Sequence, residues 1–465
     1  MLLALTSTIE AFCFIIFLEP IKSFIMRIGL LFDIDYDAVA HRQIENAGIE
    51  FDRAGFDLFR YPSKFGMVSF DFSRFARQQA KRARKLRWQG VLSHNELYGA
   101  LSAALTAEII GLPGTTPESV LACQHKLYAR RVLEKICPAE NLYHQTLCWH
   151  QDQPVLEGLI YPCYVKPIRA TFSVLARRID NSEELRRYMD FSWRERWIMK
   201  QLINPFDRII RERLPHAGSA HQLIIEEPLN GPQYNLDGFV DHRGLHVLGV
   251  VDAVMHPGTQ AFQRWELPSH LPTSVVRRAA DVAKSFLAEV GFTHGFFSLE
   301  FFYDKITNRL SVIEFNPRLS SQFSELYQRV YGLNPHAMAM ALATGRDPLQ
   351  VPRTEPTARI AASLVWRTFL EHEVPPAPSS LARQSFAQAL PDARLFVFTK
   401  SGHALKRELK WLGSHRYGVV NLGGQDADDI EAQSALASTL LGWPNAPYAL
   451  APLTQEVSGA VWAAC

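Results

Sequence analysis

The sequence lacks the features that mark several common classes of protein. None of its six cysteines form a CxxC pair, and no GxGxxG motif follows the first predicted strand, so a dinucleotide oxidoreductase is not supported. The apolar run at 11–18 is far shorter than the ~20 residues that a membrane span requires. The formal net charge is only +2, which predicts no strongly charged partner such as nucleic acid.

Length and composition indicate a globular protein of more than one domain. The chain has 465 residues, of which 47% are apolar and 21% charged. Its scattered cysteines predict reduced thiols and a cytoplasmic setting, away from any membrane. Residues 1–25 have neither the basic segment nor the small-residue cleavage site of a signal peptide, and Met26 opens the first predicted strand. We therefore expect 1–25 to be an N-terminal extension.

The order of the predicted elements divides the rest of the chain into three regions. Strands alternate with helices over 26–115, which predicts an open α/β domain. One helix is expected over 115–135, and three antiparallel strands over 222–254 begin an α+β region built around an antiparallel sheet. A smaller C-terminal α/β domain is expected over 351–465.

A predicted hairpin over 296–318 places two acidic side chains opposite each other. With a five-residue turn after Asp304, Asp304 faces Leu310 and Glu300 faces Glu314 on the neighbouring strand. The Cβ atoms of such pairs lie about 4.5–5.5 Å apart, and like charges there are destabilising. Because side chains alternate along a strand, three further polar residues share this face: Ser298, Asn316 and Arg318.

Two facing carboxylates require compensation, either by a proton on one of them or by a cation between them. Mg²⁺ prefers oxygen ligands, takes one or two carboxylates and completes its shell with water and phosphate. We therefore predict a metal site at Glu300, Glu314 and Asn316, with Arg318 as a bidentate donor to phosphate or to a reacting carboxyl group. The alternative is a solvated face of the sheet.

The segments "SLEFFYD" and "SVIEFNPRLSSQ" of this hairpin resemble the final signature of the ATP-grasp family. In that signature two acidic ligands on neighbouring strands are followed by Asn-Pro-Arg. Three earlier segments are similar, in order, to other landmarks of the family: "GLPGTTPESVLACQHKLYARRVL" to its entry helix, "YPCYVKPIRATFSV" to the strand of its second lysine, and "IIEEPLNGPQYNLDGF" to its hinge. The resemblance covers roughly 91–345.

The resemblance implies an ATP-grasp fold in which the α/β region is the usual N-terminal domain. The ATP-grasp domain would span 116–350, with a small lid subdomain at about 135–228 and a central antiparallel sheet at about 229–350. The small α/β domain at 351–465 would follow it.

The resemblance also implies which residues approach the ATP phosphates. Lys126 is the lysine of the entry helix, and Lys166 is the second nucleotide lysine. The phosphate loop at 168–173, which ends at Ser173, contains no glycine, whereas the family usually has a glycine-rich loop here. The phosphate contacts of this loop are therefore left open.

In the hinge, the resemblance places Glu226, Glu227 and the backbone as far as Leu229 along the adenine edge. Gln233 stands where the family often has an acid that binds the ribose. An amide also bonds to a hydroxyl group, so the same role is expected of Gln233.

A member of this family is expected to be a ligase. ATP-grasp ligases use ATP to convert a carboxylate into an acyl phosphate, and an amine or another nucleophile then displaces the phosphate. The expected cofactors are ATP and Mg²⁺, or Mn²⁺ in its place, and the expected partners are small carboxylates and amines, with a homodimer as the assembly common in the family. Arg318 is expected to hold the reacting group, and Arg264, in a connecting loop at 254–272, is the candidate on the acceptor side.

Three alternatives remain open from the sequence. An enzyme similar to biotin carboxylase would share the fold, although the chain has no "MKM" carrier segment. A nucleotide-binding module without chemistry would fit the glycine-free loop. A haloacid-dehalogenase-type phosphatase would use Asp33 and Asp35 of "LLFDIDYD", but no later lysine and paired aspartates support it.

Overall fold

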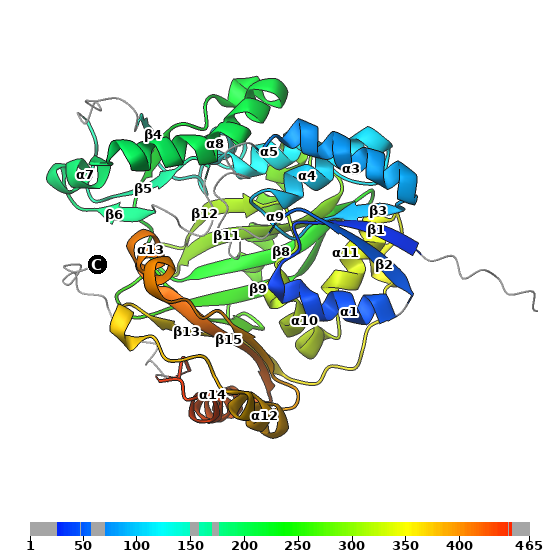
Figure 1. Cartoon of the computed structure of the whole chain (residues 1–465). Coiled ribbons are helices and arrows are strands. Elements are labelled where there is room, and N and C mark those ends of the chain that lie inside the picture. The colour runs from blue at the N-terminus through cyan, green and yellow to red at the C-terminus, as the bar shows by residue number, and fades with distance from the viewer. Residues whose placement is uncertain are drawn as a thin grey trace, which may run out of the picture.

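The structure is a computed structural model of the chain (Figure 1). It describes residues 26–46, 48–56, 70–148, 158–169, 176–444 and 446–448. The expected extension at 1–25 lies outside these ranges. The described strands form a three-stranded parallel sheet, an eight-stranded antiparallel sheet and a four-stranded antiparallel sheet, which confirms the predicted combination of α/β and α+β architecture.

The parallel sheet has the strand order β2-β1-β3 and opens the chain. Because the chain leaves β1 toward β2 and later reaches β3 on the other side, the carboxyl ends of β1 and β3 flank the crevice that holds ligands in open α/β sheets. The elements of this region are β1 Met26–Leu31, η1 Asp35–Asp37, α1 Ala38–Asn46, β2 Ile49–Ala54, α3 Phe72–Leu86, β3 Gly90–Leu92 and α4 Gly99–Ile110.

The prediction of one helix over 115–135 is wrong, because the chain forms two helices there, α5 Pro117–Gln124 and α6 Lys126–Ile136. His125 separates them with an extended backbone, and its Nδ1 accepts a hydrogen bond from the Tyr128 amide, which caps α6. The break makes Lys126 the first residue of α6.

The four-stranded sheet has the order β4-β7-β5-β6 and forms, with α7 and α8, the part of the molecule at the upper left of Figure 1. A capping box between Ser192 and Glu195 starts the long helix α8. Apolar side chains of α8, including Ile203, Phe206 and Ile210, belong to the same core as Val165 and Ile225 of the sheet. The elements are β4 His144–Leu147, β5 Cys163–Pro167, β6 Arg177–Ile179, α7 Ser182–Met189, α8 Trp193–Arg213, η2 Pro215–Ala217 and β7 Leu223–Glu226.

The eight-stranded sheet has the order β12-β11-β8-β9-β10-β13-β15-β14 and separates two helical layers. Helix α9 packs on one face against residues such as Leu236 and Leu299, whereas α10 and α11 cover the other face. Its first five strands and these helices are β8 Gln233–Asp241, β9 Gly244–Met255, β10 Phe262–Leu267, α9 Thr273–Glu289, β11 Gly295–Asp304, β12 Arg309–Asn316, η3 Ser321–Phe323, α10 Ser324–Tyr331 and α11 Pro335–Ala343.

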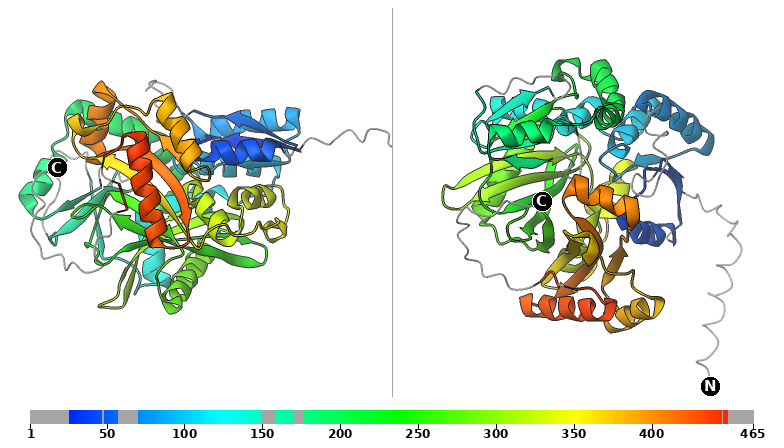
Figure 2. Two further views of the ribbon diagram at one scale, coloured as in Figure 1. Left: turned by 90° about the horizontal axis from the view of Figure 1, so that it is seen from below. Right: turned by 60° about the vertical axis from the view of Figure 1, so that its left-hand side comes forward.

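The C-terminal region supplies the remaining strands of this sheet, since β13 pairs with β10. The sequence predicted a separate small domain at 351–465, but the described strands there extend the central sheet, because β10 offers β13 a free edge. Helices α12 and α14 pack on these strands, at the end of the molecule opposite the four-stranded sheet (Figure 2). The elements are η4 Pro348–Gln350, β13 Ile360–Thr368, η5 Glu371–Glu373, α12 Ser380–Ala389, β14 Arg394–Val397, α13 Gly402–Leu412, β15 His415–Gly424 and α14 Ala427–Leu441.

The segment at 254–272 also differs from its prediction as a connecting loop. Residues Phe262–Leu267 form β10, an internal strand of the large sheet. Among the described residues, no helix combines the length and the apolar character needed to cross a membrane.

Candidate active site

The hairpin of β11 and β12 pairs Glu300 with Glu314 and Ser298 with Asn316, as predicted. The predicted pairing of Asp304 with Leu310 is wrong, because Asp304 faces Arg309. The two registers are reconciled by a β-bulge after Glu300. The turn is one residue shorter than predicted, and one extra residue in β12 restores the predicted alignment at the two glutamates.

Glu300 accepts hydrogen bonds from two amides. Gln233 Nε2 donates to Glu300 Oε2 at 2.9 Å, and Asn316 Nδ2 donates to Glu300 Oε1 at 3.0 Å. Burial and the negative charge of Glu314 raise the pKa of Glu300 from 4.5 to about 8. Near neutral pH the facing pair therefore holds one proton, which is the first of the two compensations that facing carboxylates allow.

Glu314 is compensated by lysines. Lys126 Nζ lies 2.8 Å from Glu314 Oε2. Burial alone would raise the pKa of Glu314, but the charges of Lys126 and Lys166 hold it below its ordinary value. A cation in the first turn of a helix is unfavourable because the helix dipole is positive there. The position of Lys126 is therefore explained by the carboxylate beside it and not by helix stability.

A second buried carboxylate joins the hinge to α6 and the four-stranded sheet. Glu226 accepts from Arg130 Nε and lies beside Lys166 Nζ, both at 2.7 Å, and these cations lower its pKa to about 2 against the effect of burial. Arg130 also donates to the carbonyls of Val312 and Ile313 at 2.7 and 2.8 Å. Burial lowers the pKa of Lys166. These contacts tie the end of β7 to the β-bulge of β12.

The other hinge residues lie close to this network. Glu227 forms a bidentate ion pair with Arg309, at 2.6 and 2.9 Å, and accepts from the Tyr143 amide. Leu229 is partly buried in the segment that connects β7 to β8. The predicted contacts of Glu226, Glu227 and Leu229 with adenine stay predictions, as does the ribose contact of Gln233, whose amide here meets Glu300.

Arg318 is positioned by a chain of hydrogen bonds to the sheet. Arg318 NH1 donates to Ser320 Oγ at 2.9 Å, and Ser320 Oγ in turn donates to Asp237 Oδ1 at 2.9 Å. Tyr327 donates to the other oxygen of Asp237, also at 2.9 Å. Burial raises the pKa of Asp237 to about 6. This series of hydrogen bonds lies on the same face of the sheet as Glu300, because Asp237 faces Ser298 across the β8–β11 pair.

Sequence reasoning missed two charged residues of this cluster, Glu96 and Arg169. Glu96 follows β3 and lies 3.8 Å from Arg318 NH2 and 3.7 Å from Arg169 NH1, while Arg169 NH2 also donates to the Leu97 carbonyl at 2.9 Å. Burial and the charge of Glu314 raise the pKa of Glu96. Polar residues directly after a buried strand of an open α/β sheet are a recognised signal of a ligand crevice, and this signal could have identified Glu96.

Arg264 is not brought to this cluster, so its prediction as a catalytic residue is not supported. It lies on β10, three strands from β11, and the alternation of side chains puts it on the face opposite Glu300. Its guanidinium pairs with Glu266 and stacks over Tyr448. The prediction failed because the segment forms a strand and not a loop. Ser173 and most of the phosphate loop lie outside the described residues.

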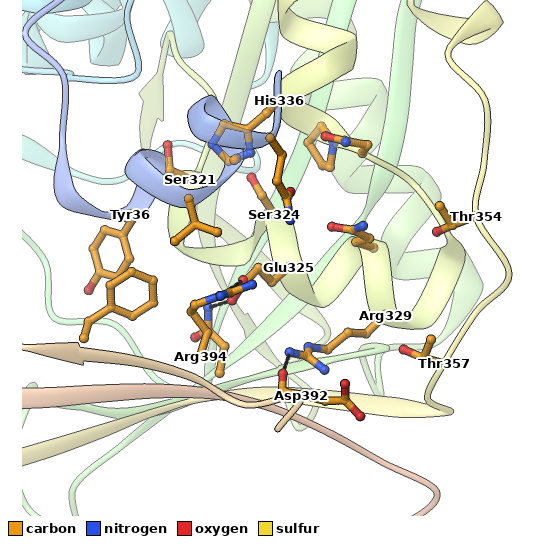
Figure 3. Close-up of a pocket in the computed structure, with 18 of the residues that line it drawn as sticks. Tyr36, Ser321, Ser324, Glu325, Arg329, His336, Thr354, Thr357, Asp392 and Arg394 are labelled. Atoms are coloured by element: carbon orange, nitrogen blue, oxygen red, sulfur yellow. Dashed lines mark hydrogen bonds and ion pairs between the residues drawn. The ribbon is translucent and has the colours of Figure 1, made fainter. Parts of the chain in front are cut away.

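A pocket of about 330 Å³ lies elsewhere, between α10, the start of α11 and the C-terminal strands (Figure 3). Its lining includes Tyr36, Glu325, Arg329, His336 and Arg394. None of the charged residues of the Glu300–Glu314 cluster line it, so the pocket and the cluster are separate features.

The donor set of the cluster suits a hard divalent cation. Glu300 and Glu314 supply carboxylate oxygens, and rotation of the Asn316 amide would present its oxygen in place of Nδ2. Mg²⁺ prefers such oxygen ligands together with water and phosphate. Burial and the repulsion by Glu314 favour a proton on Glu300, and a bound cation would take the place of this proton.

Comparisons with known proteins agree with this geometry. Residues 159–325 match the ATP-grasp domain family. The chain is 22% identical over 415 residues to the uncharacterized protein y4rH of Sinorhizobium fredii, covering 89% of this chain and 76% of that protein. It is 24% identical over 226 residues to the carbamoyl phosphate synthase large chain of Bifidobacterium adolescentis, covering 48% of this chain but only 18% of that protein.

Among solved structures, the L-amino acid ligase of Bacillus licheniformis has a TM-score of 0.62 at 15% identity. The match covers 88% of this chain and 95% of the ligase. At this identity the likeness establishes a shared fold.

Proposed function

From the ATP-grasp domain and the ATP-grasp fold that this chain has, we infer that it is an ATP-dependent ligase. It would activate a small carboxylate as an acyl phosphate and couple it to an amine or another nucleophile, with ATP between the four-stranded and eight-stranded sheets. The single observation that carries this proposal is the facing pair Glu300 and Glu314, with Lys126 on one side and the Asn316–Arg318 segment on the other.

Each charged group of the cluster has a role in this reaction. Lys126 and Lys166 would neutralise phosphate oxygens of ATP, which is the main demand of phosphoryl transfer. Mg²⁺, when bound by Glu300, Glu314 and Asn316, would supply further charge neutralisation for the phosphates. The Glu314 contact of Lys126 would give way to phosphate, since both are anionic partners for the same ammonium group.

Arg318 would hold the carboxylate substrate and then its acyl phosphate. A carboxylate oxygen attacks the γ-phosphorus of ATP, the bond to the β-phosphate oxygen breaks and ADP leaves. The amine then attacks the acyl carbon, inorganic phosphate leaves and the amine loses a proton. Glu96 lies beside Arg318 and has a raised pKa, so it is a suitable acceptor for this proton.

The test is ADP release from purified full-length protein with Mg-ATP and a panel of amino acids, other carboxylates, amines and bicarbonate. We expect release that depends on one carboxylate and one amine, and a loss of about 10²–10³-fold in Glu314→Gln, the size expected when a preorganised electrostatic group is removed. Glu289→Gln is the matched control, because Glu289 forms an ion pair with Lys135 on the surface.

Three other results would contradict the proposal in different ways. ADP release with bicarbonate alone would favour the carboxylating alternative similar to biotin carboxylase. Nucleotide binding without ADP release across the panel would favour a binding module. Unchanged activity in Glu314→Gln would remove the metal assignment.

A cytoplasmic location and a homodimer remain predictions, to be examined by cell fractionation and by light scattering of the purified protein.

A further inference from the structure

We propose that Asp37, His41, His94 and His336 bind one divalent transition-metal ion, with Zn²⁺ as the ion that suits them best. Each of these four side chains offers a ligand atom, and the four atoms all lie within 4.8 Å of one another. All four residues are buried, with 1% of Asp37 and His41 and 5% of His94 and His336 exposed. This site is distinct from the Glu300–Glu314 cluster and does not depend on the proposed ligase activity.

Two of the distances between the ligand atoms are close to those of a tetrahedral zinc site. His94 Nδ1 lies 3.1 Å from Asp37 Oδ1, and His336 Nε2 lies 2.8 Å from the same oxygen. Bonds of about 2.0–2.1 Å to a tetrahedral Zn²⁺ place neighbouring ligand atoms roughly 3.3–3.4 Å apart. The two pairs that include Asp37 Oδ1 would adjust by about half an ångström or less, and the widest pair, at up to 4.8 Å, would have to close by as much as about 1.4 Å to hold the ion.

Two polar atoms of the cluster, Asp37 Oδ2 and His94 Nε2, have neither a hydrogen bond nor an ion pair among the described residues. Buried polar atoms of proteins are nearly always hydrogen-bonded, so two such atoms in one place require an explanation. A metal ion provides one, because it satisfies imidazole and carboxylate lone pairs together.

The surroundings of His41 resemble the outer shell of a metal site. His41 Nδ1 lies 3.2 Å from Asp33 Oδ1, and Asp33 is held by Arg53 Nε at 3.1 Å. A carboxylate on the second ring nitrogen orients a metal-bound histidine and makes it a better ligand. The Asp33 that sequence reasoning weighed as a phosphatase nucleophile therefore has another role, as the outer partner of His41.

The chemistry of the donors selects the class of metal. Three imidazoles and one carboxylate favour Zn²⁺ and the neighbouring metals Co²⁺, Ni²⁺ and Cu²⁺, whereas Mg²⁺ prefers sites made of oxygen alone. The two sites of this chain would therefore bind different ions. The pocket in Figure 3 offers a route of entry, because His336 and residues on both sides of Asp37, such as Tyr36 and Val39, line it.

The position of the cluster suggests what the ion does. Asp37 and His41 come from η1 and α1, His94 follows β3, and His336 lies in the first turn of α11. The ion would thus clamp the N-terminal parallel sheet to a helix of the central sheet. His94 precedes Glu96 by two residues, so the same ion would fix the loop that carries Glu96 toward Arg318.

The test is metal binding by the full chain after treatment with a chelator. We expect one equivalent of Zn²⁺ per chain, one equivalent of Co²⁺ with the intense visible absorption of a four-coordinate ion, and no competition by Mg²⁺. His94→Gln and His336→Gln should each weaken Zn²⁺ binding at least tenfold, because even outer-shell changes weaken metal binding by about 10–100-fold. His403→Gln, an exposed position on α13, is the matched control and should bind as the parent does.

Thermal unfolding keeps the proposal testable if a histidine variant folds poorly. Zn²⁺ should raise the unfolding temperature of the parent and of His403→Gln and leave that of both ligand variants unchanged. The proposal is overturned if the folded parent protein binds less than about 0.1 equivalent of Zn²⁺, roughly tenfold below the expected stoichiometry, and gives no four-coordinate Co²⁺ spectrum. The cluster would then be a network of hydrogen-bonded side chains that share protons. Either outcome is independent of ADP release, so the two proposals fail separately.

Discussion

Glu226 and Glu300 are both buried carboxylates near the predicted nucleotide site, but their pKa values shift in opposite directions because their partners differ. Glu226 is held by the two cations Arg130 and Lys166, and its pKa falls to about 2. Glu300 faces another carboxylate and accepts only neutral amides, and its pKa rises to about 8. Burial acts on both in the same direction, so the difference comes from neighbouring charge. The first arrangement stabilises a hinge, and the second leaves a place for a cation.

The largest effect should follow from breaking the compensated side of this comparison. Arg130→Met removes a buried cation from Glu226 and leaves the Val312 and Ile313 carbonyls without their donor. We expect the free energy of unfolding to fall by about 3–5 kcal/mol, as when one partner of a buried ion pair is removed. Urea denaturation followed by circular dichroism measures it.

Lys135→Met is the control for Arg130→Met, because Lys135 forms an exposed ion pair with Glu289. Surface pairs contribute little to stability, so this variant should unfold with the parent protein. Equal denaturation midpoints for the two variants would mean that the hinge network does not stabilise the fold.

An intermediate effect is expected from breaking the series of hydrogen bonds that positions Arg318. Asp237→Asn replaces an oxygen that accepts from Ser320 or Tyr327 with a donor, so one of these hydroxyls must turn away. We expect the KM for the carboxylate found in the ADP-release screen to rise about 10-fold, while the KM for ATP changes little. The matched control is Asp281→Asn, an exposed position on α9. A larger effect on ATP than on the carboxylate would assign Arg318 to the nucleotide.

The smallest effect is a pH dependence of stability that belongs to Glu300. Because its pKa is raised from 4.5 to about 8, the folded state binds more protons than the unfolded state between these values, and stability falls as pH rises. Glu300→Gln removes this loss. The parent should therefore lose stability relative to Glu300→Gln as the pH rises from 5 to 8.

Glu226 should produce the opposite trend at acid pH. Its pKa is lowered from 4.5 to about 2, so the stability that it contributes is present above 4.5 and is lost as pH falls toward 2. Urea denaturation across both pH ranges measures the two trends. Parallel pH profiles for the parent and Glu300→Gln between pH 5 and pH 8 would contradict the raised pKa of Glu300.

The features that were predicted from the sequence are mostly local. Glu300 and Glu314 were paired correctly because they belong to one hairpin, where the turn and the alternation of side chains set the register. The bulge that corrects the turn is not visible in a pattern of apolar residues. Arg264 was misplaced because a strand with mixed polar residues, in the middle of a sheet, has the composition of a loop.

The features that were missed depend on contacts between distant segments. Glu96 meets Arg318 across more than two hundred residues, and Arg130 meets Glu226 across 96 residues and the Val312 carbonyl across 182. The histidine cluster joins positions near 40, 94 and 336. No spacing rule along the chain connects such residues, because their proximity follows from the packing of two sheets and their helices.

The most direct test of the central claim is the number of protons released when Mg-ATP binds. We expect about one proton to leave Glu300 near pH 7, because the cation replaces the proton shared by the facing carboxylates. Calorimetric titrations in two buffers of different ionisation enthalpy measure this number. Release of about one proton by the parent, and of none by Glu300→Gln, is the predicted result; Mg-ATP binding with no proton released by the parent would contradict it.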